Sequence, residues 1–307
     1  QRLSSSHVAD LNSSHFAWSQ LMQANLKKAV GEQIRIDYFP NNQLGKESDV
    51  VQQVKVGSID MMLTGSSLWA TVTPQLGMLD LGYVFDSYEH AARALDGGVG
   101  GKLNDMLVKS TGCQVITWGA HYGARNVYTK QPVKSLADVK NVKLRVLPTP
   151  AVIETFKIMG ANPTAISFGE LYMAAQTGVV DGFEHDAATV LASKLNEVVK
   201  CCWMTEHLFS PMVCVAGKRA MDKIPAALRP AFMKAAADST LQQREIGTQR
   251  GLQATEELKK LGIVFTPMAK AERDQVRKEM ETRLWSGFAK QYPETGPLFA
   301  AITAARA

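Results

Sequence analysis

Short runs of apolar and β-branched residues alternate with helix-like stretches along the first two thirds of the chain. This pattern predicts strands at Ile34–Phe39, Ile59–Leu63, Cys113–Trp118 and Lys143–Leu147, and helices at Gly45–Val56, Ala151–Met159 and Glu170–Gln176. Gly57 follows the first of these helices, at the position where a glycine commonly ends a helix. Strands that alternate with helices are typical of α/β proteins whose sheets are largely parallel.

The last third of the chain has a different pattern. Helix-forming residues dominate from Ile224 to about Leu261, with Ala235–Leu258 as the longest stretch, and Glu272–Tyr292 is a second predicted helix. Helices of this length can span two lobes or brace them from outside.

Two segments of the chain are similar to each other. Val54–Asp60 and Ala175–Asp181 each read as a helix end, a glycine, a short strand and an aspartate. Each leads into a predicted polar loop, at 64–67 and 184–186. One interpretation is two related lobes that present these loops to a shared cleft. The alternative, which the pattern leaves open, is that this order of elements is common in any α/β protein.

Length and composition agree with a globular protein of two domains. The chain has 307 residues, of which 46% are hydrophobic and 21% charged. The net charge is +5, but basic and acidic residues are interleaved, which argues against nucleic-acid binding. No window approaches the ~20 apolar residues of a membrane helix, so no stable membrane insertion is expected. The chain starts at Gln1, and we expect that a signal peptide was removed and that the protein is exported.

The four cysteines fit no zinc or redox motif. Cys202 and Cys214 would form a disulfide if the apolar runs around them lay side by side. Buried free thiols are the alternative.

Arg145 is the strongest candidate for ligand binding. It lies near the end of a predicted strand, on the same face as Lys143, and Pro148 closes that strand. Ligands bind at this edge of open α/β sheets, and a guanidinium offers two parallel donors to a carboxylate. An exposed strand arginine or a structural ion pair is the alternative.

Other polar positions allow two interpretations each. Arg125 follows a glycine-rich and aromatic segment, which suits a cleft wall, a hinge or a plain surface loop. Ser167 and Glu170 have the spacing of a helix-capping box, which would leave Phe168 at the mouth of the helix. Glu184, His185 and Asp186 are adjacent, so their side chains cannot all point at one metal ion.

Sequence motifs argue against an enzyme. The glycine run 97–102 departs from a phosphate-binding loop, since Leu103 stands where serine or threonine is required. There is no G-x-S-x-G elbow, and the six histidines form no recognisable ligand set. We therefore expect no catalytic activity, no cofactor and no metal.

Several segments, in this order, resemble the substrate-binding subunits of tripartite ATP-independent periplasmic (TRAP) transporters, the dicarboxylate-uptake (DctP-like) group. The resemblance runs from about Ile34 to His207. It rests on Phe39–Gly45, Gln53–Asp60, Pro74–Tyr83, Leu136–Asp138, Lys143–Val146, Gly160–Pro163 and Glu170–Gly182.

The resemblance implies an α/β, two-lobed periplasmic binding protein with crossing connections between its lobes and a long bracing helix. Lobe 1 would comprise residues 1–123 and 213–250, and lobe 2 residues 124–212 and 251–307. Arg145 would form a bidentate salt bridge with the ligand carboxylate. The other implied ligand-binding residues are Arg125, Phe168, Ser66, Ser67, Tyr122 and Trp69, with His7, Asp10 and His15 near them.

His185 departs from the family pattern, which has an asparagine at its position. A histidine can donate to an anion and carry charge near neutral pH. With the serine loop, it favours a small hydroxy or sugar acid.

The expected function is periplasmic capture of such an acid by hinge closure and its delivery to TRAP membrane subunits, by a monomer. A ligand-binding sensor domain, or an enzyme acting on a small organic acid, is the alternative.

Overall fold

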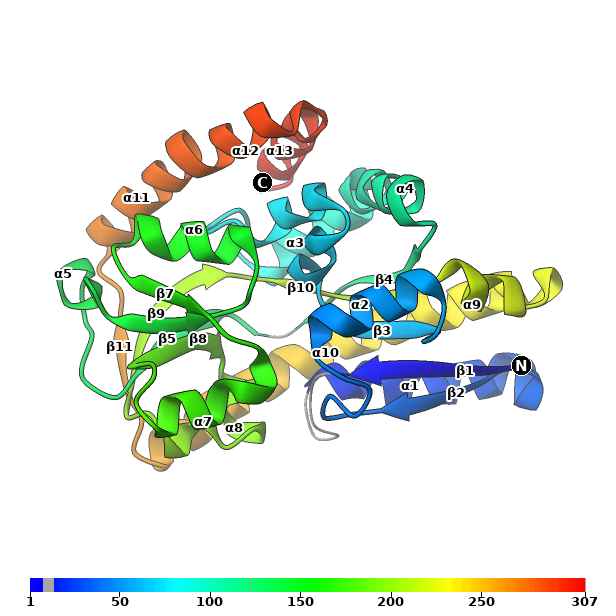
Figure 1. The fold of residues 1–307 in the computed structure, drawn as a ribbon, viewed down its shortest axis with the longest axis horizontal. Helices are drawn as coiled ribbons and strands as arrows, with labels where there is room; N and C mark the ends of the chain where they lie inside the picture. The colour runs from blue at the N-terminus through cyan, green and yellow to red at the C-terminus, as the bar shows by residue number, and fades with distance from the viewer. Residues whose placement is uncertain (8–13, 122, 307) are drawn as a thin grey trace.

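Two mixed sheets form the framework of the chain (Figure 1). The computed structural model describes residues 1–7, 14–121 and 123–306. The first sheet has the order β2-β1-β3-β10-β4 and the second the order β11-β9-β5-β8-β6-β7. The strands of the first sheet are β1 (Arg2–His7), β2 (Arg35–Phe39), β3 (Met61–Gly65), β4 (Gln114–His121) and β10 (Pro211–Ala216). The second contains β5 (Arg125–Thr129), β6 (Lys143–Val146), β7 (Asn162–Ala165), β8 (Gly182–Asp186), β9 (Cys201–Leu208) and β11 (Val264–Pro267).

Helices surround both sheets, which confirms the α/β class. They are α1 (Ser14–Val30), α2 (Glu47–Val56), α3 (Tyr88–Ala94), α4 (Gly100–Thr111), α5 (Leu136–Val139), α6 (Pro150–Ile158), α7 (Leu171–Gln176), α8 (Ala187–Ala192), α9 (Lys218–Lys223), α10 (Arg229–Lys260), α11 (Lys270–Glu279), α12 (Ser286–Gln291) and α13 (Gly296–Ala304). Three 3-10 segments matter below: η2 (Ser66–Thr71), η3 (Pro74–Asp80) and η5 (Phe168–Glu170).

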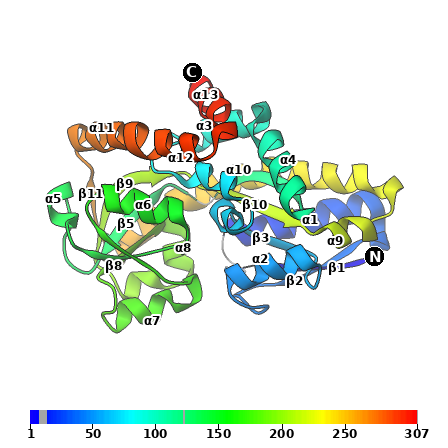
Figure 2. The same cartoon turned by 45° about the horizontal axis from the view of Figure 1, so that its top comes forward.

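The predicted long bracing helix is α10, with 32 residues. It packs against α1 and β4 beside the first sheet and against α8 beside the second, so it spans both halves (Figures 1 and 2).

The chain crosses between the sheets at two points besides α10. It passes from β4 to β5, and it returns from β9 to β10, which confirms the crossing connections. Each arriving strand pairs antiparallel with its new sheet, and for this reason the sheets are mixed rather than largely parallel. The division into lobes at 123/124 and 212/213 stays a prediction.

Residues 80–88 anchor both crossings. Tyr83 donates its backbone N–H to His207 O at 2.9 Å and its hydroxyl to Thr205 O at 3.0 Å, in the part of β9 that leads into the return crossing. The Tyr88 hydroxyl donates to Gly123 O at 2.6 Å, on the outward crossing. One short segment of the first half therefore holds both hinge strands.

The helix predicted at Glu272–Tyr292 is present as one continuous helical stretch, in which a π-helical segment at Met280–Trp285 joins α11 to α12. The capping box predicted at Ser167 and Glu170 was wrong. The Ser167 side chain makes no capping bond, and Glu170 instead accepts from Lys46, so the capping box is absent.

The cysteines are all free. Cys202 lies on β9 and Cys214 on β10, in different sheets, so the runs around them are not side by side. The alternative of free thiols therefore holds, with Cys201 half-buried and the other three buried.

Candidate ligand-binding site

The two halves of the molecule touch across the space between their sheets. Lys46 follows β2 in the first half, and its Nζ lies 3.3 Å from Glu170 Oε1 in η5 of the second half. Asn42 lies against Gly169 beside this ion pair. The two halves therefore contact each other here, where residues near the ends of the strands face each other.

Arg145 lies in β6, between β7 and β8, and is fully buried. Its Nε donates to Ile166 O at 2.8 Å. Its Nη1 and Nη2 are both buried and find no hydrogen-bond partner in the described parts of the chain. Burial lowers the pKa of Arg145 to about 10, so the group is charged near neutral pH. Phe168 covers it, with the ring centre 5.8 Å from the guanidinium carbon.

An enclosed guanidinium whose two terminal nitrogens lack partners is unfavourable, because a buried charge needs a counter-charge or hydrogen bonds. An anion with two parallel oxygens supplies both. That Arg145 anchors the ligand carboxylate stays a prediction, and this geometry supports it.

Glu47 was not anticipated from the sequence. It begins α2, is buried, and accepts a hydrogen bond from the Thr64 hydroxyl. Burial raises its pKa, while the charges of Arg145 and Arg125 lower it, so it faces both arginines from the opposite half. Acidic residues are common in the first turn of a helix, where they interact favourably with the helix dipole. The sequence position of Glu47 therefore gave no sign of a role in binding.

His185 lies in strand β8, not in the polar loop that was predicted at 184–186. Its ring centre lies 5.4 Å from that of Phe168, and its Nδ1 lies 2.8 Å from Asp186 Oδ1. Burial, and then the charge of Arg125, lower its pKa, so the ring is neutral near neutral pH. The expectation that it carries charge there is not supported.

Arg125 opens β5 and is buried, not exposed in a loop. Its Nε and Nη2 donate to the two carboxylate oxygens of Glu184, at 2.6 and 2.7 Å. His207 Nε2 lies 3.2 Å from the same carboxylate. Burial alone would raise the pKa of Glu184, but Arg125 and His207 hold it well below its usual range. A direct contact between Arg125 and the ligand stays a prediction.

The predicted wall of the first half lies in η2. Ser66 and Ser67 are buried, and Ser66 donates to Asp80 Oδ2 at 2.8 Å. Asp80 also accepts from Ser210, which lies on the return crossing, so the serine wall is tied to the hinge. Trp69 is fully buried.

The N-terminal candidates are only partly described. His7 ends β1 and is buried, with Nε2 3.3 Å from Ser5 Oγ and 3.2 Å from Ser19 Oγ. Tyr122 and Asp10 lie outside the described residues, and the side chain of His15 is likewise not described.

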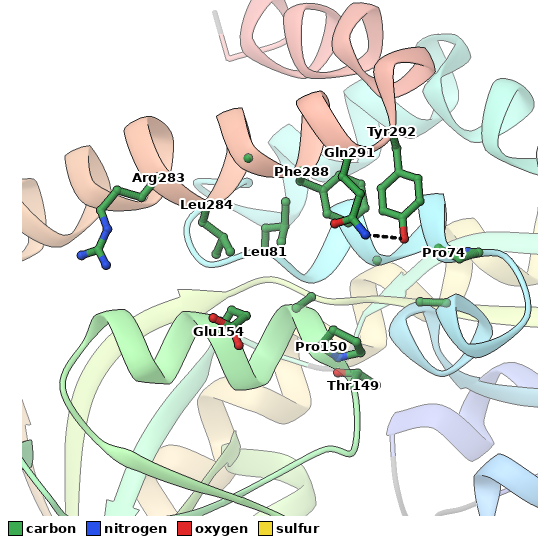
Figure 3. A pocket seen from close by; sticks show the side chains of 14 residues that line it. Pro74, Leu81, Thr149, Pro150, Glu154, Arg283, Leu284, Phe288, Gln291 and Tyr292 are labelled. Atoms are coloured by element: carbon green, nitrogen blue, oxygen red, sulfur yellow. Dashed lines mark hydrogen bonds between the residues drawn. The ribbon is translucent and has the colours of Figure 1, made fainter.

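A separate groove of about 390 Å³ lies between η3, α6 and α12 (Figure 3). Its lining is mostly apolar and includes Leu81, Pro150, Leu284 and Phe288. Its charged groups are neutralised by neighbours on their own helical segments: Glu154 by Lys157, and Arg283 by Glu279. The groove therefore offers no free anchor for an acid, in contrast to Arg145.

The described residues contain no group of three or more His, Cys, Asp or Glu side chains that could hold a metal ion. None of the helices in the same ranges is long and apolar enough to cross a membrane.

Known proteins resemble this chain over nearly its full length. A 2,3-diketo-L-gulonate-binding periplasmic protein (YiaO) of Escherichia coli is 29% identical and covers 96% of this chain and 89% of its own. A TRAP periplasmic solute-binding protein from Polaromonas sp. JS666, solved with D-erythronate, is 26% identical, with a TM-score of 0.93 and coverage of 100% and 99% of the two chains. The sugar-acid-binding protein DctPAm from Advenella mimigardefordensis, solved with galactonate, is 26% identical, with a TM-score of 0.93 and coverage of 99% and 98%.

The family of bacterial extracellular solute-binding proteins, family 7 (DctP), matches residues 5–291. This confirms the TRAP resemblance, the periplasmic location and the expectation that the protein is a binding protein and not an enzyme. Members of this family bind small carboxylate ligands. The chain belongs to the DctP family of TRAP periplasmic solute-binding proteins.

Proposed function

We propose that this protein captures a small sugar acid, or a related hydroxy acid, by hinge closure and delivers it to TRAP membrane subunits. The observation that carries the proposal is Arg145, a buried guanidinium with two terminal nitrogens that lack partners in the described chain. A ligand carboxylate would complete both hydrogen bonds and neutralise the charge.

The ligand class follows from the polar groups near Arg145. Glu47 and His185 supply hydrogen-bonding atoms in a buried setting, and ligand hydroxyls would pair with them. Similar structures were solved with D-erythronate, galactonate and D-glucuronate, which are all sugar acids. The relative named for 2,3-diketo-L-gulonate makes an oxo acid the second candidate.

Closure follows from the way the halves are joined. The chain passes between the sheets at the two strand crossings and through α10. A hinge motion there would separate Lys46 from Glu170 and open the path to Arg145. The acid would dock on Arg145 in the open form. Closure would then bring Glu47 and the Ser66–Ser67 wall toward it and exclude water, which strengthens charge-assisted bonds.

Calorimetric titration with D-erythronate, D-galactonate, D-glucuronate and succinate tests the proposal. We expect a sugar acid to bind tightly and remain chemically unchanged. Replacing Arg145 by Met should weaken that binding by roughly 2–5 kcal/mol, because one partner of a buried charge pair is lost. The control is Lys143→Met, on the exposed start of the same strand, which should bind normally. Equal affinity of the Arg145→Met variant and the wild type would overturn the proposal.

A further inference from the structure

One nitrogen of the His185 ring is held by its neighbour in the chain. Nδ1 lies 2.8 Å from Asp186 Oδ1, while Asp186 Oδ2 accepts the Thr189 N–H at 2.9 Å and caps α8. An ionised carboxylate only accepts hydrogen bonds, so this contact requires a proton on Nδ1.

A competing contact is weaker. Nδ1 also lies 3.0 Å from the Asp186 backbone N–H, and a bond there requires an unprotonated Nδ1. That arrangement would set the Nδ1 lone pair against a carboxylate oxygen at 2.8 Å. The charge-assisted bond to the carboxylate is stronger than the neutral one, so the proton belongs on Nδ1.

The other nitrogen is consequently an acceptor. Burial lowers the pKa of His185, so the ring carries one proton near neutral pH. With that proton on Nδ1, Nε2 presents a lone pair. No described residue forms a hydrogen bond with Nε2, because the hydrogen bonds between the ring and the described residues are both made by Nδ1.

His185 and Arg145 share one face of the second sheet. Arg145 pairs in register with Phe183 on the neighbouring parallel strand, and His185 is two residues further along that strand. Residues two apart point to the same side. Phe168 contacts both side chains. For an acid whose carboxylate binds Arg145, we therefore infer that the substituent on the next carbon faces His185.

We propose that His185 selects 2-hydroxy acids over 2-oxo acids, because its Nε2 accepts a hydrogen bond from the 2-hydroxyl group. The inference rests on the proposed carboxylate anchor at Arg145. A 2-oxo group has lone pairs and no proton, so it would face the lone pair of Nε2 in a buried site. Such a mismatch leaves both groups unpaired, and we expect it to reduce affinity by roughly tenfold to a hundredfold.

The first test compares matched acids by calorimetry: D-glycerate with hydroxypyruvate, and 2,4-dihydroxybutyrate with 4-hydroxy-2-oxobutyrate, which cannot close into a cyclic hemiketal. The hydroxy acid should bind at least tenfold more tightly in a pair that binds. Equal affinities, or tighter binding of the oxo acid, overturn the inference and leave the proposed function standing. Absence of binding by all of these acids and by the sugar acids above overturns both.

The second test moves the proton. In Asp186→Asn, the side-chain oxygen must still cap the Thr189 N–H, so the amide NH2 faces Nδ1 and donates to it. The ring proton then shifts to Nε2, and the preference for the hydroxy acid should disappear or invert. In a His185→Ala background the same Asp186→Asn change should leave the preference unaltered, which separates the histidine from any effect on the helix cap.

Histidine ¹⁵N NMR of the wild-type protein reads the tautomer directly and needs no variant. A proton on Nδ1 supports the inference. A proton on Nε2, or a doubly protonated ring at neutral pH, overturns it.

Discussion

Buried histidines make the stability of this protein depend on pH. Burial lowers the pKa of His7 to about 3, and it lowers those of His185 and His207 as well. The unfolded chain binds protons at these rings below about pH 6.5, while the folded chain resists them. The stability they contribute is therefore present above pH 6.5 and is lost as the pH falls toward 3.

The prediction for a single residue concerns His7. Between pH 6.5 and 4.5 the free energy of unfolding should fall, with up to about 1.4 kcal/mol per pH unit from His7. Urea unfolding of the wild type and of His7→Asn at several pH values measures this. The free energy of unfolding of the variant should change less per pH unit than that of the wild type. Identical slopes would contradict it. Glu47 and Asp80, whose pKa values burial raises, act in the opposite direction but are common to both proteins.

Single residues were predictable from the sequence only as far as their chemistry is local. Arg145 and Phe168 were named from the motifs around them, and the structure brings them together. The bidentate pair of Arg125 with Glu184 was not predicted, because its members are 59 positions apart and an arginine looks the same in a sequence whether it is paired or free.

Among the elements, β8 matters most to the site because it carries Glu184, His185 and Asp186. It packs closely against β5: a Cβ on Gly182 would lie 2.2 Å from Tyr128 O. We predict that Gly182→Ala lowers the free energy of unfolding by roughly 1–3 kcal/mol through overpacking and weakens acid binding as β8 shifts.

Gly287→Ala is the matched control for that change. A Cβ there meets nothing within 4 Å, and alanine favours the helix by up to about 1 kcal/mol. Urea unfolding and calorimetric titration of both variants check the prediction. A Gly182→Ala protein as stable as the wild type, with normal affinity, would contradict it.

The same strand shows why some elements were misassigned from the sequence. Three consecutive polar residues are typical of a loop, so residues 184–186 were predicted as one. Strands with a regular alternation of apolar and polar residues were predicted correctly. In the structure these polar side chains are buried but paired, Glu184 with Arg125 and His185 with Asp186. Long-range pairing removes the cost of burial, and no local pattern reveals it.

Across the whole molecule, the ion pair between Lys46 and Glu170 joins the two halves at the mouth of the site. Both side chains are more than half exposed, at 56% and 55%, so the pair contributes at most about 1 kcal/mol. We predict that Lys46→Gln speeds ligand dissociation less than about fivefold. Added salt should reduce the difference from the wild type.

Stopped-flow measurements at low and high salt test this. Lys157→Gln is the control, because it removes a similarly exposed pair within a single helix and should leave dissociation unchanged. An increase of more than tenfold in the dissociation rate of Lys46→Gln would contradict the prediction, because it would mean that the pair does more than hold the two halves together.

The arrangement of the halves was predictable only through the family resemblance. Alternating strands and helices indicate an α/β protein, but they do not tell which strand joins which sheet. β4 and β5 are separated by three residues and β9 and β10 by two, and yet each pair divides between the two sheets. That division depends on contacts of Tyr83, Tyr88 and Asp80, which lie far away in the sequence.

The central claim is that Arg145 anchors a ligand carboxylate inside the closed protein. A crystal structure of the complex with D-galactonate, or with the sugar acid that binds best, tests it most directly. We predict the two carboxylate oxygens within hydrogen-bond distance of Nη1 and Nη2 of Arg145, with the halves closed around the acid. An acid bound elsewhere, or with its carboxylate turned away from Arg145, would contradict the account.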